Sequence, residues 1–207
     1  MNFLSLTWND LSWTPWISFS DPFKPFPSGP GMYRVRAVNG NELFYLGETG
    51  RNLRERVGDL RRGTMQELMP YNDPHTTAPS LWAWRHAEGI AFECSVASVT
   101  LADTKEEARR LREGLEFYLL WQYRLEFGFS TRCNHGCFHP RYVKSTDRKK
   151  GFQGHRLPDT APDKPAGGPS LPHDTPAYQR HEVENDLLGG FYALTRNIPT
   201  FQLIDHH

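Results

Sequence analysis

The feature that most constrains the fold is a pair of candidate strands joined by an asparagine–glycine turn. Residues 32–38 alternate as a strand does, and Glu42-Leu43-Phe44-Tyr45-Leu46 is the second candidate strand. A period of two is typical of strands that bury one face. Asn39-Gly40-Asn41 lies between the two segments, and these residue types readily adopt the positive φ of a tight hairpin turn. The sequence therefore predicts an antiparallel β-hairpin here.

Helices and one further strand are expected after the hairpin. Leu53, Val57 and Leu60 recur at helical spacing, which predicts a helix over residues 52–60. A short helix, a third strand and a long helix follow, at about residues 81–87, 92–99 and 104–126. This order predicts an α+β fold, in which an antiparallel hairpin and a third strand are flanked by helices.

The long helix has the clearest pattern in the chain. Asp103 or Thr104 can cap its start, and Glu106 and Glu107 lie in its first turn, where the helix dipole favours acids. Its expected apolar stripe consists of Ala108, Leu111, Leu115, Tyr118, Leu119, Gln122 and Leu125.

The composition divides the chain into three parts. Residues 1–28 form an arm rich in aromatics and proline, residues 29–135 carry the patterned elements, and residues 136–207 form a basic extension rich in proline and glycine. The arm either packs its aromatic rings on the domain or offers them to a partner or to DNA bases. Within the extension, residues 157–176 have the composition of a linker, and a last helix and strand are expected near 178–188 and 192–203.

Charge and cysteine content limit the class of protein. The formal net charge is zero, so a uniformly basic coat is excluded, although a basic face is compatible with it. Three cysteines favour a reducing compartment over a disulfide framework. No run approaches eighteen apolar residues and the first fourteen residues do not resemble a secretory signal, so we expect a cytoplasmic protein without a membrane span.

Five separated motifs follow one another in the order of a known nuclease family. They are Gly31-Met32-Tyr33, Tyr45-Leu46-Gly47, Asn52-Leu53-Arg54-Glu55-Arg56, a helix with Leu115-Glu116, Leu119-Leu120 and Tyr123-Arg124, and finally Asn134. Together they resemble the GIY-YIG nucleases over about residues 29–135. The resemblance implies the small GIY-YIG core with N- and C-terminal extensions, and a DNA endonuclease that leaves 5′-phosphate and 3′-hydroxyl ends.

The same resemblance assigns roles that suit the chemistry of the residues. Glu116 would bind Mg²⁺ or Mn²⁺, since such hard cations take one or two carboxylates and leave room for phosphate. Arg56 would stabilise the transition state with its permanently charged fork. Tyr33 would activate the water and Tyr45 would orient the water or the phosphate, with adjacent cationic charge lowering the tyrosine pKa. Asn134 completes the expected catalytic set.

A basic stretch near the C-terminal end of the core suggests the DNA-binding surface. Residues 132–156 hold seven Lys or Arg against one acid, and such a stretch can track a phosphate backbone. The candidate contacts are Arg54, His135, Arg141, Lys144, Arg148, Lys149 and Lys150. The size of the chain is most like that of stand-alone restriction enzymes in the family, which implies a homodimer or higher assembly on a palindromic site.

Two departures from the family pattern keep other interpretations open. Leu60 stands where many relatives have histidine or tyrosine, and Glu48 follows the second tripeptide where some have lysine. Both features favour a catalytically silent nucleic-acid-binding module, and a single-strand or structure-specific nuclease is a further alternative. A zinc-stabilised interaction protein would use Cys133, His135, Cys137 and His139, although four ligands within seven residues do not easily surround one ion.

Overall fold

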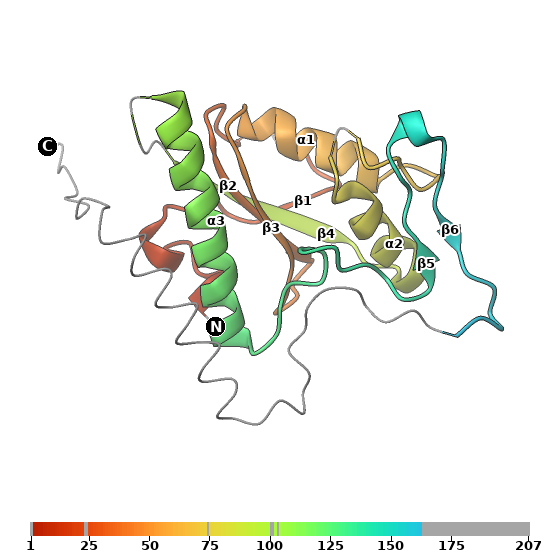
Figure 1. The fold of residues 1–207 in the computed structure, drawn as a ribbon. Helices are drawn as coiled ribbons and strands as arrows, with labels where there is room; N and C mark the ends of the chain where they lie inside the picture. Colours follow the sequence, from red (N-terminus) through yellow and green to blue (C-terminus); the bar gives the residue numbers. More distant parts are fainter. Residues whose placement is uncertain (1, 23–24, 74, 100–101, 103, 163–207) are drawn as a thin grey trace, which may run out of the picture. The chain divides into compact units, whose positions relative to one another are not determined.

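The computed structural model describes residues 2–22, 25–73, 75–99, 102 and 104–162. The chain divides into two compact units, Met1–Pro169 and Ser170–His207. The second unit lies outside the described residues, and so do the helix and strand expected near 178–188 and 192–203. The first unit has a mixed α+β fold (Figure 1).

A four-stranded antiparallel sheet forms the centre of this unit, with the strand order β1-β4-β2-β3. The strands are β1 (Ile17–Ser18), β2 (Gly31–Ala37), β3 (Leu43–Thr49) and β4 (Phe92–Ser98). The expected hairpin is confirmed as the β2–β3 pair, and the positive φ of its turn falls on Asn39, at 58°. The expected third strand is confirmed as β4, which pairs with β2 along its whole length.

Helices cover both faces of the sheet (Figure 1). α1 (Leu53–Thr64) and α2 (Ala78–Glu88) pack against each other on one side, and α3 (Lys105–Phe127) packs on the other. One apolar core includes Val35, Val57 and Leu60 on the α1 side. A second core includes Met32 and Leu119 on the α3 side. Because successive side chains of β2 point to opposite faces of the sheet, this strand contributes to both cores.

The N-terminal arm belongs to the core of the unit. It contains two short 3₁₀ turns, η1 (Asn2–Leu4) and η2 (Trp8–Asp10), and β1, which adds to the edge of the sheet beside β4. Five of its aromatic side chains are buried, namely Phe3, Trp8, Trp13, Phe19 and Phe26. The packing interpretation of the arm is confirmed for these residues.

Three tryptophans of the arm, Trp8, Trp13 and Trp16, lie around a buried arginine. Arg34 is fully buried and donates hydrogen bonds to the carbonyl oxygens of Phe3, at 2.5 Å, and Ser5, at 2.9 Å. Its guanidinium lies 4.1 Å from the ring centroid of Trp13, and the aromatic face partly replaces the solvent that the cation has lost. Burial lowers the pKa of Arg34 to about 9.

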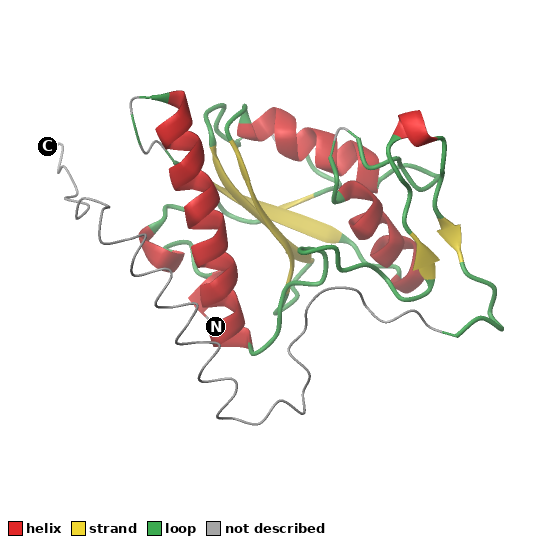
Figure 2. Cartoon of the chain, viewed as in Figure 1, coloured by secondary structure: helices red, strands yellow, loops and turns green. Residues whose placement is uncertain are grey.

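The chain after α3 returns along the free edge of β3 and then reaches α2. The backbone amide of Cys133 donates to the carbonyl oxygen of Phe44, at 2.8 Å. Residues 128–156 include a two-stranded sheet of β5 (Tyr142–Val143) and β6 (His155–Arg156) and a short turn, η3 (Arg148–Lys150) (Figure 2). In the part of the chain that is described, no helix has the length and apolarity needed to cross a membrane.

Candidate active site

Two tyrosines of the hairpin lie on the sheet face that carries α1. Tyr33 pairs with Gly47, and Tyr45 pairs with Val35, so the two side chains are diagonal neighbours on one face. Their ring centroids are 5.8 Å apart. Both hydroxyl groups lie over Gly47, where a Cβ would come within 2.7 Å of the Tyr45 oxygen and 2.9 Å of the Tyr33 oxygen. The glycine of the second tripeptide therefore makes room for the two converging hydroxyls.

The neighbouring motif residues fix α1 against this face. Asn52 caps the helix, because its side chain accepts a hydrogen bond from the amide of Glu55 at 3.2 Å. Leu53 is fully buried and packs over Gly31, where any Cβ would collide with Leu53 and with the carbonyl oxygen of Ala97. These motif residues therefore position the helix, while its next turn carries Arg56.

Arg56 brings positive charge to the tyrosine pair. Its positive charge acts on both Tyr33 and Tyr45. Burial nevertheless raises the pKa of Tyr33 well above its usual value of 10, and the neighbouring Tyr45 adds to the rise, while Arg56 lowers it by less. The expected lowering of the tyrosine pKa is therefore wrong for this state, because complete burial of Tyr33 outweighs the nearby cation.

Tyr45 is the more accessible of the two tyrosines. Burial raises its pKa, and the negative charge of Glu116 adds to this, whereas hydrogen bonds with Thr77 and Tyr33 and the charge of Arg56 lower it. The side chain keeps partial exposure, while that of Tyr33 has none.

Glu116 acts on this group from α3, the helix on the opposite side of the sheet. Because β3 is the edge strand, a side chain of α3 can approach Tyr45 around that edge. Burial, together with the charges of Glu48 and Glu113, raises the pKa of Glu116 to about 7. A bound cation stabilises a carboxylate held among like charges more than it stabilises an isolated carboxylate.

Glu48 and Glu113 already have basic partners. Arg112 is buried and its Nε lies 3.0 Å from Glu48, while Arg109 binds Glu113 at 2.7 Å. The charge of Glu48, which follows the second tripeptide, is therefore compensated by Arg112. Glu116 remains the donor that fits a hard cation with open positions for water and phosphate. Over the described residues, no group of three or more His, Cys, Asp or Glu side chains is placed to hold a metal ion, at Glu116 or elsewhere.

His75 joins the site although nothing in the sequence analysis singled it out. It lies between α1 and α2 and is 1% exposed, and its Nε2 is 2.9 Å from the hydroxyl oxygen of Tyr33. Its ring centroid is 5.9 Å from those of both tyrosines. A lone histidine in a loop carries no periodic or motif signal, so only the folded chain reveals its place.

The side chain of Asn134 makes structural hydrogen bonds. Its side-chain oxygen accepts hydrogen bonds from the amide of Leu46, at 3.0 Å, and the hydroxyl of Thr131, at 2.6 Å. Its side-chain nitrogen donates to the carbonyl oxygen of Leu46 at 2.7 Å. The asparagine thus ties the segment after α3 to the edge strand between Tyr45 and Gly47, and so it supports the site indirectly.

The expected DNA-binding residues occupy several environments. Arg54 donates to the carbonyl oxygen of Phe26 at 2.6 Å, and Arg141 donates to those of Ala161 and Pro158 at 2.8 and 2.9 Å. Arg54 and Arg141 therefore tie down neighbouring segments.

The other expected contacts lie nearer the surface. His135, Arg148 and Lys149 are exposed, and Lys144 is half-buried with a pKa lowered by burial. Lys150 belongs to η3, and its side chain lies outside the described part. These residues come from one continuous stretch, but the structure does not gather them all around the tyrosines.

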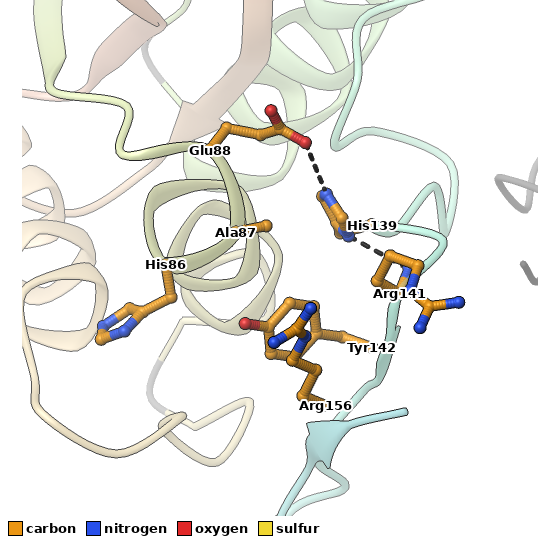
Figure 3. Close-up of a pocket in the computed structure, with 7 residues that line it drawn as sticks. All are labelled: His86, Ala87, Glu88, His139, Arg141, Tyr142 and Arg156. Carbon is orange, nitrogen blue, oxygen red and sulfur yellow. Dashed lines mark hydrogen bonds and ion pairs between the residues drawn. The ribbon is translucent and has the colours of Figure 1, made fainter. Parts of the chain in front are cut away.

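A separate cavity of about 240 Å³ lies at the C-terminal end of α2, lined by His86, Ala87, Glu88, His139, Arg141, Tyr142 and Arg156 (Figure 3). His139 contacts Glu88 at 3.3 Å, and Asp159 contacts both Arg141, at 3.5 Å, and Arg156, at 3.0 Å. The acids balance the two arginines, so the cavity has no excess charge that would select an ion. The Cys133–His139 stretch forms no metal cluster among the residues that are described.

We compared the chain with models of protein families, with curated proteins and with solved structures, and none of the three comparisons found a match. The functional assignment therefore depends on the motifs and on the geometry of their side chains.

Proposed function

We propose that this chain is a metal-dependent DNA endonuclease of the GIY-YIG type. The observation that supports this best is the convergence of Tyr33, Tyr45 and Arg56 on one sheet face, with the charge of Glu116 acting on Tyr45. Four residues from four different elements have the types that phosphodiester hydrolysis requires: a proton acceptor, a fixed cation and a metal-binding carboxylate. An ordinary buried sheet has no need to bring these groups together.

The chemistry follows from the positions of the side chains. A water molecule attacks phosphorus, a new P–O bond forms, and the bond from phosphorus to the 3′ oxygen breaks, which leaves 5′-phosphate and 3′-hydroxyl ends. The attacking water gives its proton to the ionised form of the tyrosine pair, and the 3′ oxygen takes a proton from solvent. Arg56 favours that ionised form and also stabilises the negative charge that grows on the phosphate oxygens.

Glu116 is the residue that would hold Mg²⁺ or Mn²⁺. Once bound, the ion would supply positive charge to the phosphate and would relieve the repulsion among Glu116, Glu48 and Glu113. The narrower proposal is a sequence-specific restriction-type enzyme that acts as a homodimer or higher assembly. The exposed side chains of Arg148 and Lys149 are the available contacts for the DNA backbone.

The first test is cleavage of a panel of DNA substrates with Mg²⁺ and then with Mn²⁺. The panel contains plasmid, long linear duplex, single strands and branched junctions, and the ends of any product are identified by ligation and by phosphatase treatment. Discrete duplex fragments with 5′-phosphate ends are expected. Cleavage restricted to single strands or junctions would replace the restriction proposal with the structure-specific alternative.

A binding module without catalysis is the second candidate, and one observation favours it. Tyr33 is completely buried, and the pKa values of both tyrosines are raised, so that neither phenol is a ready base at neutral pH in this state. This candidate predicts tight DNA binding and no cleavage of any substrate with either metal. The endonuclease proposal predicts cleavage that becomes faster at alkaline pH.

A further inference from the structure

The histidine beside the tyrosine pair has a hydrogen-bonding direction that the geometry fixes. The backbone amide of Thr77 donates to Nδ1 of His75 at 3.2 Å. A nitrogen that accepts a hydrogen bond carries no hydrogen, so a neutral ring must carry its hydrogen on Nε2. Nε2 lies 2.9 Å from the hydroxyl oxygen of Tyr33, and therefore His75 donates and Tyr33 accepts.

The ring is held neutral by its surroundings. Burial lowers the pKa of His75 to about 3, and the positive charges of Arg56 and Arg51 contribute to the lowering. A histidine that does not gain a proton near neutral pH cannot shuttle protons in this site. It is instead a permanent hydrogen-bond donor of fixed orientation.

The direction of this bond determines what the two tyrosines do. Because the oxygen of Tyr33 accepts from His75, the hydroxyl hydrogen of Tyr33 is available for another acceptor. The oxygen of Tyr45 converges on the same point over Gly47, and the two rings lie 5.8 Å apart, so Tyr45 offers an acceptor for that hydrogen. The order of donation is then His75 to Tyr33 and Tyr33 to Tyr45.

Thr77 also favours Tyr45 as the acceptor at the end of this order of donation. It stands at the start of α2, but its side chain makes no capping hydrogen bond to that helix. Its hydroxyl interacts with Tyr45 and lowers the pKa of that phenol. The segment just before α2 therefore places one side chain beside each tyrosine, His75 beside Tyr33 and Thr77 beside Tyr45.

We propose that His75 is a positioning residue for the tyrosine pair: it donates through Nε2 to Tyr33, directs the hydroxyl hydrogen of Tyr33 to Tyr45, and so keeps Tyr45 as the hydrogen-bond acceptor that faces substrate. Its consequence for cleavage rests on the endonuclease function proposed above. The arrangement itself is a property of the folded protein and can be measured without DNA.

Two substitutions of His75 separate its bonds. Glutamine places an amide nitrogen near the position of Nε2 and keeps the donor to Tyr33. Asparagine is shorter: it keeps an acceptor for Thr77 but does not reach Tyr33. We expect His75→Asn to lower kcat at least about tenfold with KM changed less than about threefold, and His75→Gln to recover most of that loss. Equal losses in the two variants would overturn the proposal.

A double substitution tests whether the effect passes through Tyr33. When Tyr33→Phe has removed the accepting oxygen, adding His75→Asn should change kcat by less than about twofold. If His75 had only a structural role, His75→Asn would lower kcat by the same factor in the wild type and in Tyr33→Phe. That additive result would contradict the proposed role.

The closing experiment is nitrogen-15 NMR of the histidine rings in the full-length protein without DNA. His75 should show a protonated Nε2 and an unprotonated Nδ1, unchanged from pH 5 to 9, with an Nε2 proton signal that shifts in Tyr33→Phe. A protonated Nδ1, or titration near pH 6, would overturn the proposal even if His75→Asn fails to fold. If the protein cleaves no DNA but the tautomer is as expected, the endonuclease proposal fails and the arrangement of His75 stands.

Discussion

At the scale of single residues, burial and charge decide the chemistry of the site more than residue type does. Tyr33 and Tyr45 have the identities that a water-activating pair needs, yet burial raises the pKa of both. Glu116 has the identity of a metal ligand, and its environment makes its ionised form costly without a cation. The residue types could be read from the sequence, whereas the direction of these shifts required the packing around them.

The raised tyrosine pKa predicts an alkaline pH–rate profile. If the ionised tyrosine pair accepts the proton, its population grows about tenfold for each pH unit below its pKa. Under single-turnover conditions we expect the logarithm of the cleavage rate to rise with pH from 7 to 9 without a plateau. A rate that levels off near pH 7 would exclude a tyrosine base and would point to a group that ionises earlier.

The raised pKa of Glu116 predicts that the stability difference between the wild type and Glu116→Gln depends on pH. Its folded pKa of about 7 lies above the ordinary value of 4.5, so the wild type loses stability relative to Glu116→Gln as pH rises through this range. The free energies of unfolding should agree at pH 4, and above pH 7 the variant should be more stable by at most about 3 kcal/mol. Urea denaturation at several pH values without metal measures this difference.

Added Mg²⁺ supplies the complementary control. It should raise the melting temperature of the wild type above pH 7 and leave Glu116→Gln unchanged, because only the carboxylate attracts the ion. Glu107→Gln, an exposed glutamate on the same helix, controls for the general loss of charge. A stability difference that does not vary with pH would refute the environment assigned to Glu116.

At the scale of elements, the local patterns predicted the strands and helices well. The hairpin, the third strand and the helices near 52–60, 81–87 and 104–126 all appear, and Thr104 caps α3 by accepting from the amide of Glu107 at 3.3 Å. The apolar stripe of α3 was less accurate. Leu125 is 53% exposed, while Tyr123 is buried and its hydroxyl accepts from the amide of Leu43. Helical spacing indicates a face, but its edges depend on which partner the helix meets.

The β2–β3 hairpin supplies the sharpest test at this scale. In Gly47→Ala the new Cβ would press on both tyrosine hydroxyls, so the strand pair must shift by several tenths of an ångström. We expect cleavage to fall at least about tenfold and the free energy of unfolding to fall by about 1–3 kcal/mol. Gly58→Ala is the matched control, since its Cβ meets only the far end of Arg62 at 3.5 Å. Unaltered cleavage by Gly47→Ala would mean that the two hydroxyls do not act in catalysis.

At the scale of the whole described unit, long-range contacts account for what the sequence could not predict. The N-terminal arm surrounds Arg34, Asn134 holds the edge of β3, and His75 reaches Tyr33 across 42 positions of sequence. None of these contacts leaves a periodic signal, because each joins irregular segments to the sheet. The motifs named the residues of the candidate site, and the contacts that support those residues could be found only in the fold.

The contacts of the N-terminal arm with Arg34 predict that the arm stabilises the whole unit. Deleting residues 1–10 removes the carbonyl oxygens of Phe3 and Ser5 and leaves the guanidinium of Arg34 without these acceptors. We expect a loss of at least about 3 kcal/mol in the free energy of unfolding, measured by urea denaturation. Arg34→Met in the shortened chain should recover part of the loss. A shortened chain of unchanged stability that binds DNA weakly would instead support the DNA-stacking interpretation of the arm.

The most direct measurement of the central claim is single-turnover cleavage by three proteins on the best substrate of the DNA panel. These are the wild type, Glu116→Ala and Glu113→Ala, with DNA affinity measured in Ca²⁺ for each. Glu113 lies on the same helix and is bound by Arg109 at the surface, so its loss should change the rate less than about threefold. The account predicts that Glu116→Ala loses at least about 10³ in rate and keeps its affinity for DNA. Wild-type cleavage that survives in Glu116→Ala, or that is lost equally in both variants, would contradict it.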